Sequence, residues 1–308
     1  MELPAHGHEP VMLAEVLAHL NLAPGQTAVD CTVGRGGHSE AIAQKIKPGG
    51  HLLALDVDPE NLKYARARVD AAAAGAAEGQ GATCRYFHAN FGELEDVVRS
   101  ADVDGVDAVL ADLGVSTNQI FDGKHGLSFS EDEKLDMRLD PRIRKTAADL
   151  VATLDEKELA RILFEYAQER FSRQIARKIV SVRAVEPMKT TGQLARVIKS
   201  VVPPRYEHGS RIDPSTRTFQ ALRMAVNDEL GVLEAFLDTL PEIMNPGGRV
   251  VVISFHSGED RLVKHAFRGF ENEGFAEVLT KKPLEPSETE IARNPRSRSA
   301  KLRACVFK

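Results

Sequence analysis

The sequence of 308 residues has few cysteines and few of the larger aromatic side chains: it has no tryptophan, four tyrosines and three cysteines. The cysteines are far apart and form no CxxC pair, which argues against a disulfide framework. The ten histidines lack metal-ligand spacing, and we predict no metal site. No apolar run reaches the about eighteen residues of a membrane span, and residues 1–10 lack the pattern of a secretory signal. These absences predict a cytoplasmic protein without a membrane partner.

Acidic and basic residues are nearly balanced overall, but they are unevenly distributed along the chain. The net charge of −5 argues weakly against a nucleic-acid partner. Residues 140–225 nevertheless hold 17 Lys and Arg against 10 Asp and Glu, and residues 281–308 hold 8 against 3. A basic middle and a basic tail on an acidic body fit an electrostatic footprint for RNA, and they fit a solvated helical face equally well.

Short apolar runs alternate with helical stretches through the first third of the chain. This alternation predicts parallel strands with right-handed crossovers, and therefore an α/β fold. We expect strands at residues 26–31, 51–57, 83–89, 106–113 and 249–255, short β-like runs at 276–280 and 302–307, and helices at 39–45 and 59–73.

The alternation stops near residue 116. Residues 120–145 are polar without a clear period, and residues 147–201 have apolar side chains at helical spacing. One long helix is expected at residues 218–240. We therefore predict a core made of residues 1–115 and 218–308, with an inserted helical domain at residues 116–217 that recognises the substrate.

A glycine-rich turn between the first strand and the next helix is the first candidate binding element. Glycines there let the backbone approach a ligand closely. Asp56 ends the second strand, where an acid can accept hydrogen bonds from ribose hydroxyls. Because Asp58 and Pro59 already supply the cap of the following helix, we expect Asp56 to be free for a ligand.

This pattern suits NAD as well as S-adenosyl-L-methionine, and two acids favour the second. Asp30, at the end of the first strand, would repel a pyrophosphate. Asp112, at the end of the fourth strand, would attract a sulfonium or an ammonium group. Phe91 follows the third strand, where it can cover an adenine ring or belong to the core.

The sequence resembles the 16S rRNA (cytosine N4)-methyltransferase family, ribosomal RNA small subunit methyltransferase H, along nearly its whole length. Seven motifs carry the resemblance in order: HEPVM at residues 8–12, DCTVGRGGHS at 30–39, DLGVS at 112–116, LDMRLD at 135–140, RTFQALR at 217–223, SFHS and EDR within 254–261, and NPR at 294–296.

The resemblance implies a Rossmann-like class I methyltransferase core with an inserted helical domain. It implies methylation of the exocyclic amine (N4) of a single cytidine in 16S rRNA near the ribosomal P site, in the small ribosomal subunit, and no DNA substrate. Carried over position by position, the cofactor residues of the family fall on Gly36, Gly37, His38, Asp56, Phe91, Asp112 and Gln119.

The catalytic group stays open at this point. Asp112 is the candidate, for the cofactor, the amine or both, but the proline pair and aromatic of DNA amino-methyltransferases do not follow it. A small-molecule methyltransferase, an NAD oxidoreductase and a non-catalytic RNA-binding assembly factor remain alternatives. Candidate RNA contacts are Arg138, Arg217, Ser254, His256, Arg296 and Arg298, although Ser254 and His256 also fit strand-end capping and packing.

Overall fold

The computed structural model describes residues 9–116, 119–120, 124–202 and 213–308, so His8 of the first motif lies outside the described residues. The chain divides into two compact units, each described here by itself. Unit 1 comprises Met1–Gly114 and Leu230–Lys308, and unit 2 comprises Val115–Glu229.

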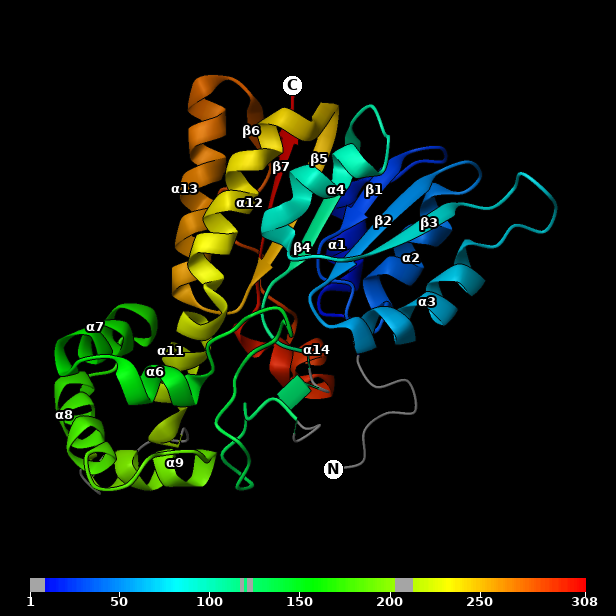
Figure 1. The fold of residues 1–308 in the computed structure, drawn as a ribbon. Coiled ribbons are helices and arrows are strands. Elements are labelled where there is room, and N and C mark those ends of the chain that lie inside the picture. The colour runs from blue at the N-terminus through cyan, green and yellow to red at the C-terminus, as the bar shows by residue number, and fades with distance from the viewer. Residues whose placement is uncertain (1–8, 117–118, 121–123, 203–212) are drawn as a thin grey trace. The chain divides into compact units, whose positions relative to one another are not determined.

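A seven-stranded sheet in the order β3-β2-β1-β4-β5-β7-β6 forms the centre of unit 1 (Figure 1). The neighbours from β3 to β5 are parallel, as the alternating pattern predicts, whereas β7 runs antiparallel to both β5 and β6. This is the Rossmann-like order, in which ligands bind beyond the carboxyl ends of the strands where the order reverses, here at β1 and β4. The strands are β1 (Thr27–Asp30), β2 (His51–Asp56), β3 (Thr83–His88), β4 (Val106–Asp112), β5 (Met244–Ser254), β6 (Ala276–Val278) and β7 (Lys301–Phe307).

Helices cover both faces of this sheet. One face packs against α1, α2 and α3, and the other packs against α4, α12 and α13. Because both faces are covered, the central strands are apolar along most of their length, as in Leu52–Leu55. The bounds are α1 (Leu13–Leu20), α2 (Gly37–Ile46), α3 (Pro59–Ala73), η1 (Phe91–Glu93), α4 (Leu94–Ser100), α12 (Glu229–Ile243), α13 (Ser257–Glu273), α14 (Glu288–Arg293) and η2 (Pro295–Ser299).

Unit 2 is helical in its described part and has a core of its own. Apolar residues such as Leu159, Ile175, Leu194 and Leu222 are buried together there. The helices are α6 (Ala147–Thr153), α7 (Glu156–Ala167), α8 (Ser172–Arg183), α9 (Thr191–Lys199) and α11 (Ser215–Asn227). The spacing of apolar residues therefore predicted the helical character of this segment correctly.

The single long helix predicted at residues 218–240 is wrong. The chain turns at Asp228, whose φ of 48° is left-handed, and this turn separates α11 from α12. The Asn227 side chain fixes the end of α11: its Nδ2 donates to the carbonyl oxygens of Met137 and Arg223, and its Oδ1 accepts from the Leu139 N–H. The residues of α11 join the core of unit 2, so the division after Glu229 differs from the predicted boundary at 217/218.

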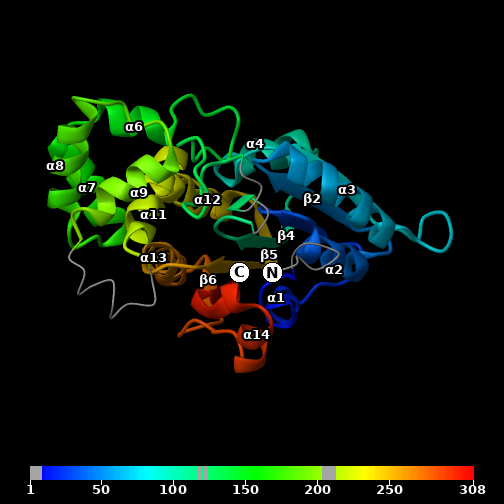
Figure 2. The same cartoon turned by 90° about the horizontal axis from the view of Figure 1, so that it is seen from below.

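The segment that precedes α1 is joined to the C-terminal part of the chain. The Met12 N–H donates to Glu290 Oε1 at 2.8 Å, and Arg293 pairs with Glu9 at 2.7 Å. Figure 2 shows α14 beside α1 accordingly. Among the described residues, none of the helices has the length and apolar character that crossing a membrane requires.

Candidate active site

The turn between β1 and α2 is held by the buried carboxylate of Asp30. Its Oδ2 accepts the Ser39 hydroxyl at 2.6 Å, and its Oδ1 accepts the Thr32 N–H at 3.1 Å. Burial raises the pKa of Asp30 to about 6. Gly36 precedes α2 with a φ of 82°, and a Cβ there would lie only 3.0 Å from Val69 Cγ2, so this position requires glycine. Asp30 therefore holds the turn in shape through these hydrogen bonds, whereas the sequence analysis considered only its negative charge.

Asp56 lies at the end of β2, as predicted, but the expectation that it is free is wrong. Asp58 does cap α3, by accepting the Glu60 N–H at 3.0 Å. The Asp56 carboxylate itself accepts the N–H groups of Gly34 and Asp58, each at 2.8 Å, and it lies 3.4 Å from Asn61 Nδ2. Its burial raises its pKa to about 7. Two carboxylate oxygens offer about four acceptor sites, so its predicted ribose contact would add to these bonds.

Asp112 has an unsatisfied oxygen at the carboxyl end of β4. Its backbone N–H donates to Thr32 Oγ1 at 2.8 Å, whereas its side-chain Oδ1 is buried without a hydrogen-bond partner among the described residues. Its other oxygen, Oδ2, lies 3.7 Å from His38 Nδ1. A buried acceptor without a partner is costly, which makes this oxygen the best candidate to meet a ligand.

His38, in the first turn of α2, faces Asp112 as a neutral ring. Burial lowers its pKa to about 4. Its Nε2 lies 2.9 Å from the carbonyl oxygen of Val11, so Nε2 carries the proton and donates it to that oxygen. The lone pair of Nδ1 is therefore directed at the Asp112 carboxyl group.

The surroundings of Asp112 are acidic. Burial, followed by the charges of Asp30 and Glu259, raises the pKa of Asp112 well above its usual range. Without a positive ligand, the group therefore favours its neutral form. A sulfonium or an ammonium group would reverse this preference, because an opposite charge favours the ionised carboxylate.

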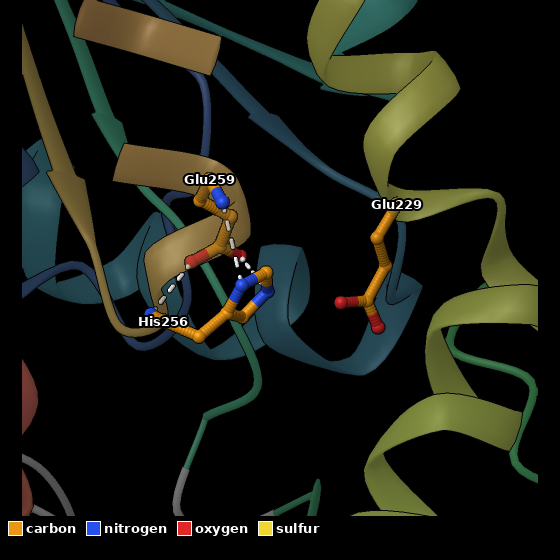
Figure 3. Close-up of side chains that lie close together, drawn as sticks. All are labelled: Glu229, His256 and Glu259. Atoms are coloured by element: carbon orange, nitrogen blue, oxygen red, sulfur yellow. Dashed lines mark hydrogen bonds and ion pairs between the residues drawn. The ribbon is translucent and has the colours of Figure 1, made fainter. Parts of the chain in front are cut away.

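The end of β5 leads into a capping box at the start of α13 (Figure 3). Glu259 Oε2 accepts the backbone N–H groups of Phe255 and His256, and its Oε1 lies 3.2 Å from His256 Nε2. His256 Nδ1 accepts the Glu259 N–H in return. Ser254 is buried, with its hydroxyl 3.4 Å from the Lys301 carbonyl oxygen. The capping interpretation of His256 is confirmed, and its RNA contact, like that of Ser254, stays a prediction.

The remaining cofactor candidates are placed in both units. Gly37 opens α2, directly before His38. Phe91 is partly buried, and its ring meets that of Phe236 edge-on at 5.7 Å between centroids. Gln119 belongs to unit 2, where it is buried and its Oε1 accepts the Ser116 N–H at 3.0 Å. Their contacts with a cofactor stay predictions.

The four arginines proposed to contact RNA differ in their exposure and in the hydrogen bonds that they make within the protein. Asp136 holds Arg138 through two hydrogen bonds of 2.6 and 2.8 Å. Arg217 is exposed, with Nη1 3.2 Å from the Gln168 carbonyl oxygen. In η2, Arg296 is half-buried, which lowers its pKa, whereas Arg298 is exposed.

The reasoning from sequence missed three residues that shape this edge of the sheet. They are Ser39 and Asn61, which bind the acids of β1 and β2, and Glu259. Glu259 had a signal that was not used, because a Glu three residues after a cap residue is the spacing of a capping box.

The chemistry of this edge fits S-adenosylmethionine. Asp30 and Asp56 contribute buried carboxyl groups and Asp112 contributes a partly buried one, and among the described residues none of the three pairs with a lysine or an arginine. Arg35, within the turn, lies 4.6 Å over the Tyr64 ring instead. Carboxylates suit a sulfonium, an ammonium group and ribose hydroxyls, and they would repel a pyrophosphate. With the strand order, this edge defines the class of Rossmann-like methyltransferases that use S-adenosylmethionine.

Comparison with known proteins gives the family. The model of the MraW methylase family matches residues 5–308, and the chain belongs to that family. It is 47% identical over 302 residues to the ribosomal RNA small subunit methyltransferase H of Acidobacterium capsulatum, covering 98% of both chains. It is 44% identical over 312 residues to the protein of the same name from Geobacter sulfurreducens, covering 96% of this chain and 97% of the relative.

A solved structure of a putative rRNA methylase from Clostridium thermocellum aligns with 98% of this chain and 100% of its own, with a TM-score of 0.46 and 10% identity.

Proposed function

We propose that this methyltransferase transfers a methyl group to the exocyclic N4 amine of a single cytidine in 16S rRNA, near the P site of the small ribosomal subunit. The names of its full-length relatives support small-subunit rRNA as the substrate. The observation that carries the chemistry is the buried Oδ1 of Asp112, which has no hydrogen-bond partner among the described residues and lies at the carboxyl edge of the sheet. A ribosomal substrate would place the activity in the cytoplasm.

S-adenosylmethionine supplies an electrophilic methyl group on a positively charged sulfur. Residues of the turn, Gly36 to His38, and the acids Asp56 and Asp112 would hold it. Fixing the two reactants in line supplies much of the rate, on the order of 7–11 kcal/mol in favourable systems.

Asp112 is also placed to act on the cytosine amine. The lone pair of that amine is conjugated with the ring, so an acceptor that binds its N–H helps the nitrogen become tetrahedral. As the methyl carbon passes from sulfur to nitrogen, breaking its bond to sulfur, the amine would become acidic and Asp112 would accept its proton. Neutral His38 keeps its Nδ1 lone pair toward Asp112, so it leaves the carboxylate oxygen available to the amine.

Substrate recognition would fall to unit 2 and to the basic C-terminal segment. The cytosine must leave its stack to reach the methyl group, at a cost of a few kcal/mol, and phosphate contacts offset that cost. Arg217 and Arg298 are exposed and available for such contacts.

The test is methyl transfer from radiolabelled S-adenosylmethionine to small subunits that lack native modifications, with mass spectrometry of the digested RNA. The wild-type chain should place label in N4-methylcytidine. Asp112→Asn should lower the rate on the order of 10²- to 10⁴-fold, the range of a lost proton acceptor. Asp96→Asn, an exposed change on α4, is the matched control and should retain the wild-type rate.

The other outcomes separate the alternatives. Cofactor binding without label in RNA would favour a small-molecule methyltransferase. No cofactor binding would leave the non-catalytic RNA-binding assembly factor.

A further inference from the structure

A basic pocket lies on unit 1 between α13 and the segment that links β6 to β7. Its volume is about 190 Å³, and its lining includes Lys264 and Arg268 from α13, Thr280 and Lys281 after β6, and Arg303 from β7. This is room for several water-sized groups. No residue of the candidate active site lines it.

The positive charge of the pocket exceeds the negative charge beside it, because three of its four lining cations have no ion-pair partner in the described part of the chain. Among the residues that the structure describes, Lys264, Arg268 and Lys281 take part in no ion pair or side-chain hydrogen bond. The one acid in the lining, Glu271, already accepts the Val278 N–H at 3.1 Å. Lys264 and Arg268 lie one helical turn apart, where two like charges repel unless an anion lies between them.

The floor of the pocket provides fixed polar groups. Arg303 is buried, and it binds Asp260 through Nε at 2.7 Å and Nη2 at 3.3 Å. Its Nη1 makes no hydrogen bond to the described residues, so the N–H groups of Nη1 remain to donate to a ligand. The Thr280 hydroxyl is also buried and accepts the Ala304 N–H at 2.9 Å, which leaves its own proton to donate. Cations and fixed N–H and O–H donors that line one pocket suit an oxyanion such as phosphate, because charge-assisted hydrogen bonds are the strong ones.

We propose that this pocket binds a phosphate group of the RNA backbone, as a second grip on the substrate away from the reacting base. The proposal rests on the proposed RNA substrate. Lys264 lies about 10 Å along α13 from Ser257, at 1.5 Å per residue, so the pocket would bind the RNA backbone and not the reacting base. Such a contact fixes the register of the RNA and carries no sequence information.

The experiment compares two double variants of the full chain, with filter binding of small subunits over a range of salt. Lys264→Gln/Arg268→Gln removes pocket charge. Lys45→Gln/Lys63→Gln removes two exposed charges on α2 and α3, over the other face of the sheet. The pocket variant should bind about tenfold more weakly at low salt, and its slope of log K against log salt should fall by about 0.7–0.9 for each lost phosphate contact. The control variant should bind like the wild type, and both should keep the wild-type melting temperature.

Equal affinities and slopes for the two variants would overturn the proposal. A second arm adds inorganic phosphate: if it raised the melting temperature of the wild type but not of the pocket variant, while the RNA affinities stayed equal, the pocket would serve a free phosphate and the RNA contact would be wrong. Methyl transfer at saturating subunits should persist in the pocket variant, so a failed grip leaves the proposed function standing. Absence of label with the wild type would refute the proposed function itself.

Discussion

At the scale of single residues, the burial of Asp30 in the cofactor turn makes the stability of the protein depend on pH. In the folded protein its pKa is raised to about 6, against an ordinary value near 3.8. Between these values the folded state keeps the proton that the unfolded chain releases, so this group makes the protein less stable as pH rises from about 4 to 6. Asp30→Asn removes that loss. Relative to the wild type, its free energy of unfolding should therefore increase by on the order of 3 kcal/mol across this window.

Urea unfolding of the cofactor-free protein at pH 4, 5, 6 and 7 measures this difference. An asparagine retains an acceptor for the Thr32 N–H and a donor for the Ser39 hydroxyl oxygen, so the variant should fold. A difference between the two proteins that stays constant with pH would show that Asp30 titrates as an ordinary exposed acid.

At the scale of elements, the junction between β5 and α13 depends on Glu259. Its buried carboxylate satisfies the N–H groups of Phe255 and His256. Glu259→Ala should lower the free energy of unfolding by about 1–3 kcal/mol, because two backbone donors lose their acceptor. Glu273→Ala, at the exposed C-terminal end of the same helix, should change it by less than about 0.5 kcal/mol. Denaturant unfolding tests the pair, and equal effects would refute the capping role.

The elements themselves were predictable where local pattern and tertiary packing agree. The helix at Pro59–Ala73 and the strands that begin at His51, Thr83 and Val106 were predicted within a residue or two of their ends, because apolar runs and the Asp58 cap are local signals. The break at Asp228 was not, because the apolar spacing continues through it while the left-handed turn depends on contacts made by Asn227 with residues 137–139.

The same limit applies to the candidate site. Sequence reasoning placed Asp56 and Asp112 at the ends of their strands. It therefore placed both at one edge of the sheet, because the carboxyl ends of parallel strands share an edge. It did not predict that His38 Nδ1 faces Asp112, or that Gly34 and Asp58 occupy the Asp56 carboxylate. Those contacts join residues whose separation and direction only the packed turn decides.

At the scale of the whole molecule, the acidic edge of the sheet belongs to unit 1, which is formed by two separate stretches of the chain. The acids of β1, β2 and β4 come from the first stretch, and Glu259, whose charge acts on Asp112, comes from the second. A ligand that binds these acids therefore stabilises a unit assembled across the insertion, and unfolding of that unit should respond to it as a whole.

S-adenosylmethionine should accordingly raise the melting temperature, by an amount equivalent to about 2.7 kcal/mol at a hundred times its dissociation constant. NAD should not, because its pyrophosphate would need a cation and Arg35, the arginine of the turn, is turned onto Tyr64. Differential scanning calorimetry measures both, and hydrogen exchange should show the protection in residues 30–39, 56–61 and 106–112 of unit 1.

Asp112→Asn should reduce the shift from S-adenosylmethionine more than that from S-adenosylhomocysteine, which lacks the positive sulfur. Equal losses for the two ligands would mean that Asp112 binds the amino acid part of the cofactor and leaves the sulfonium to other groups.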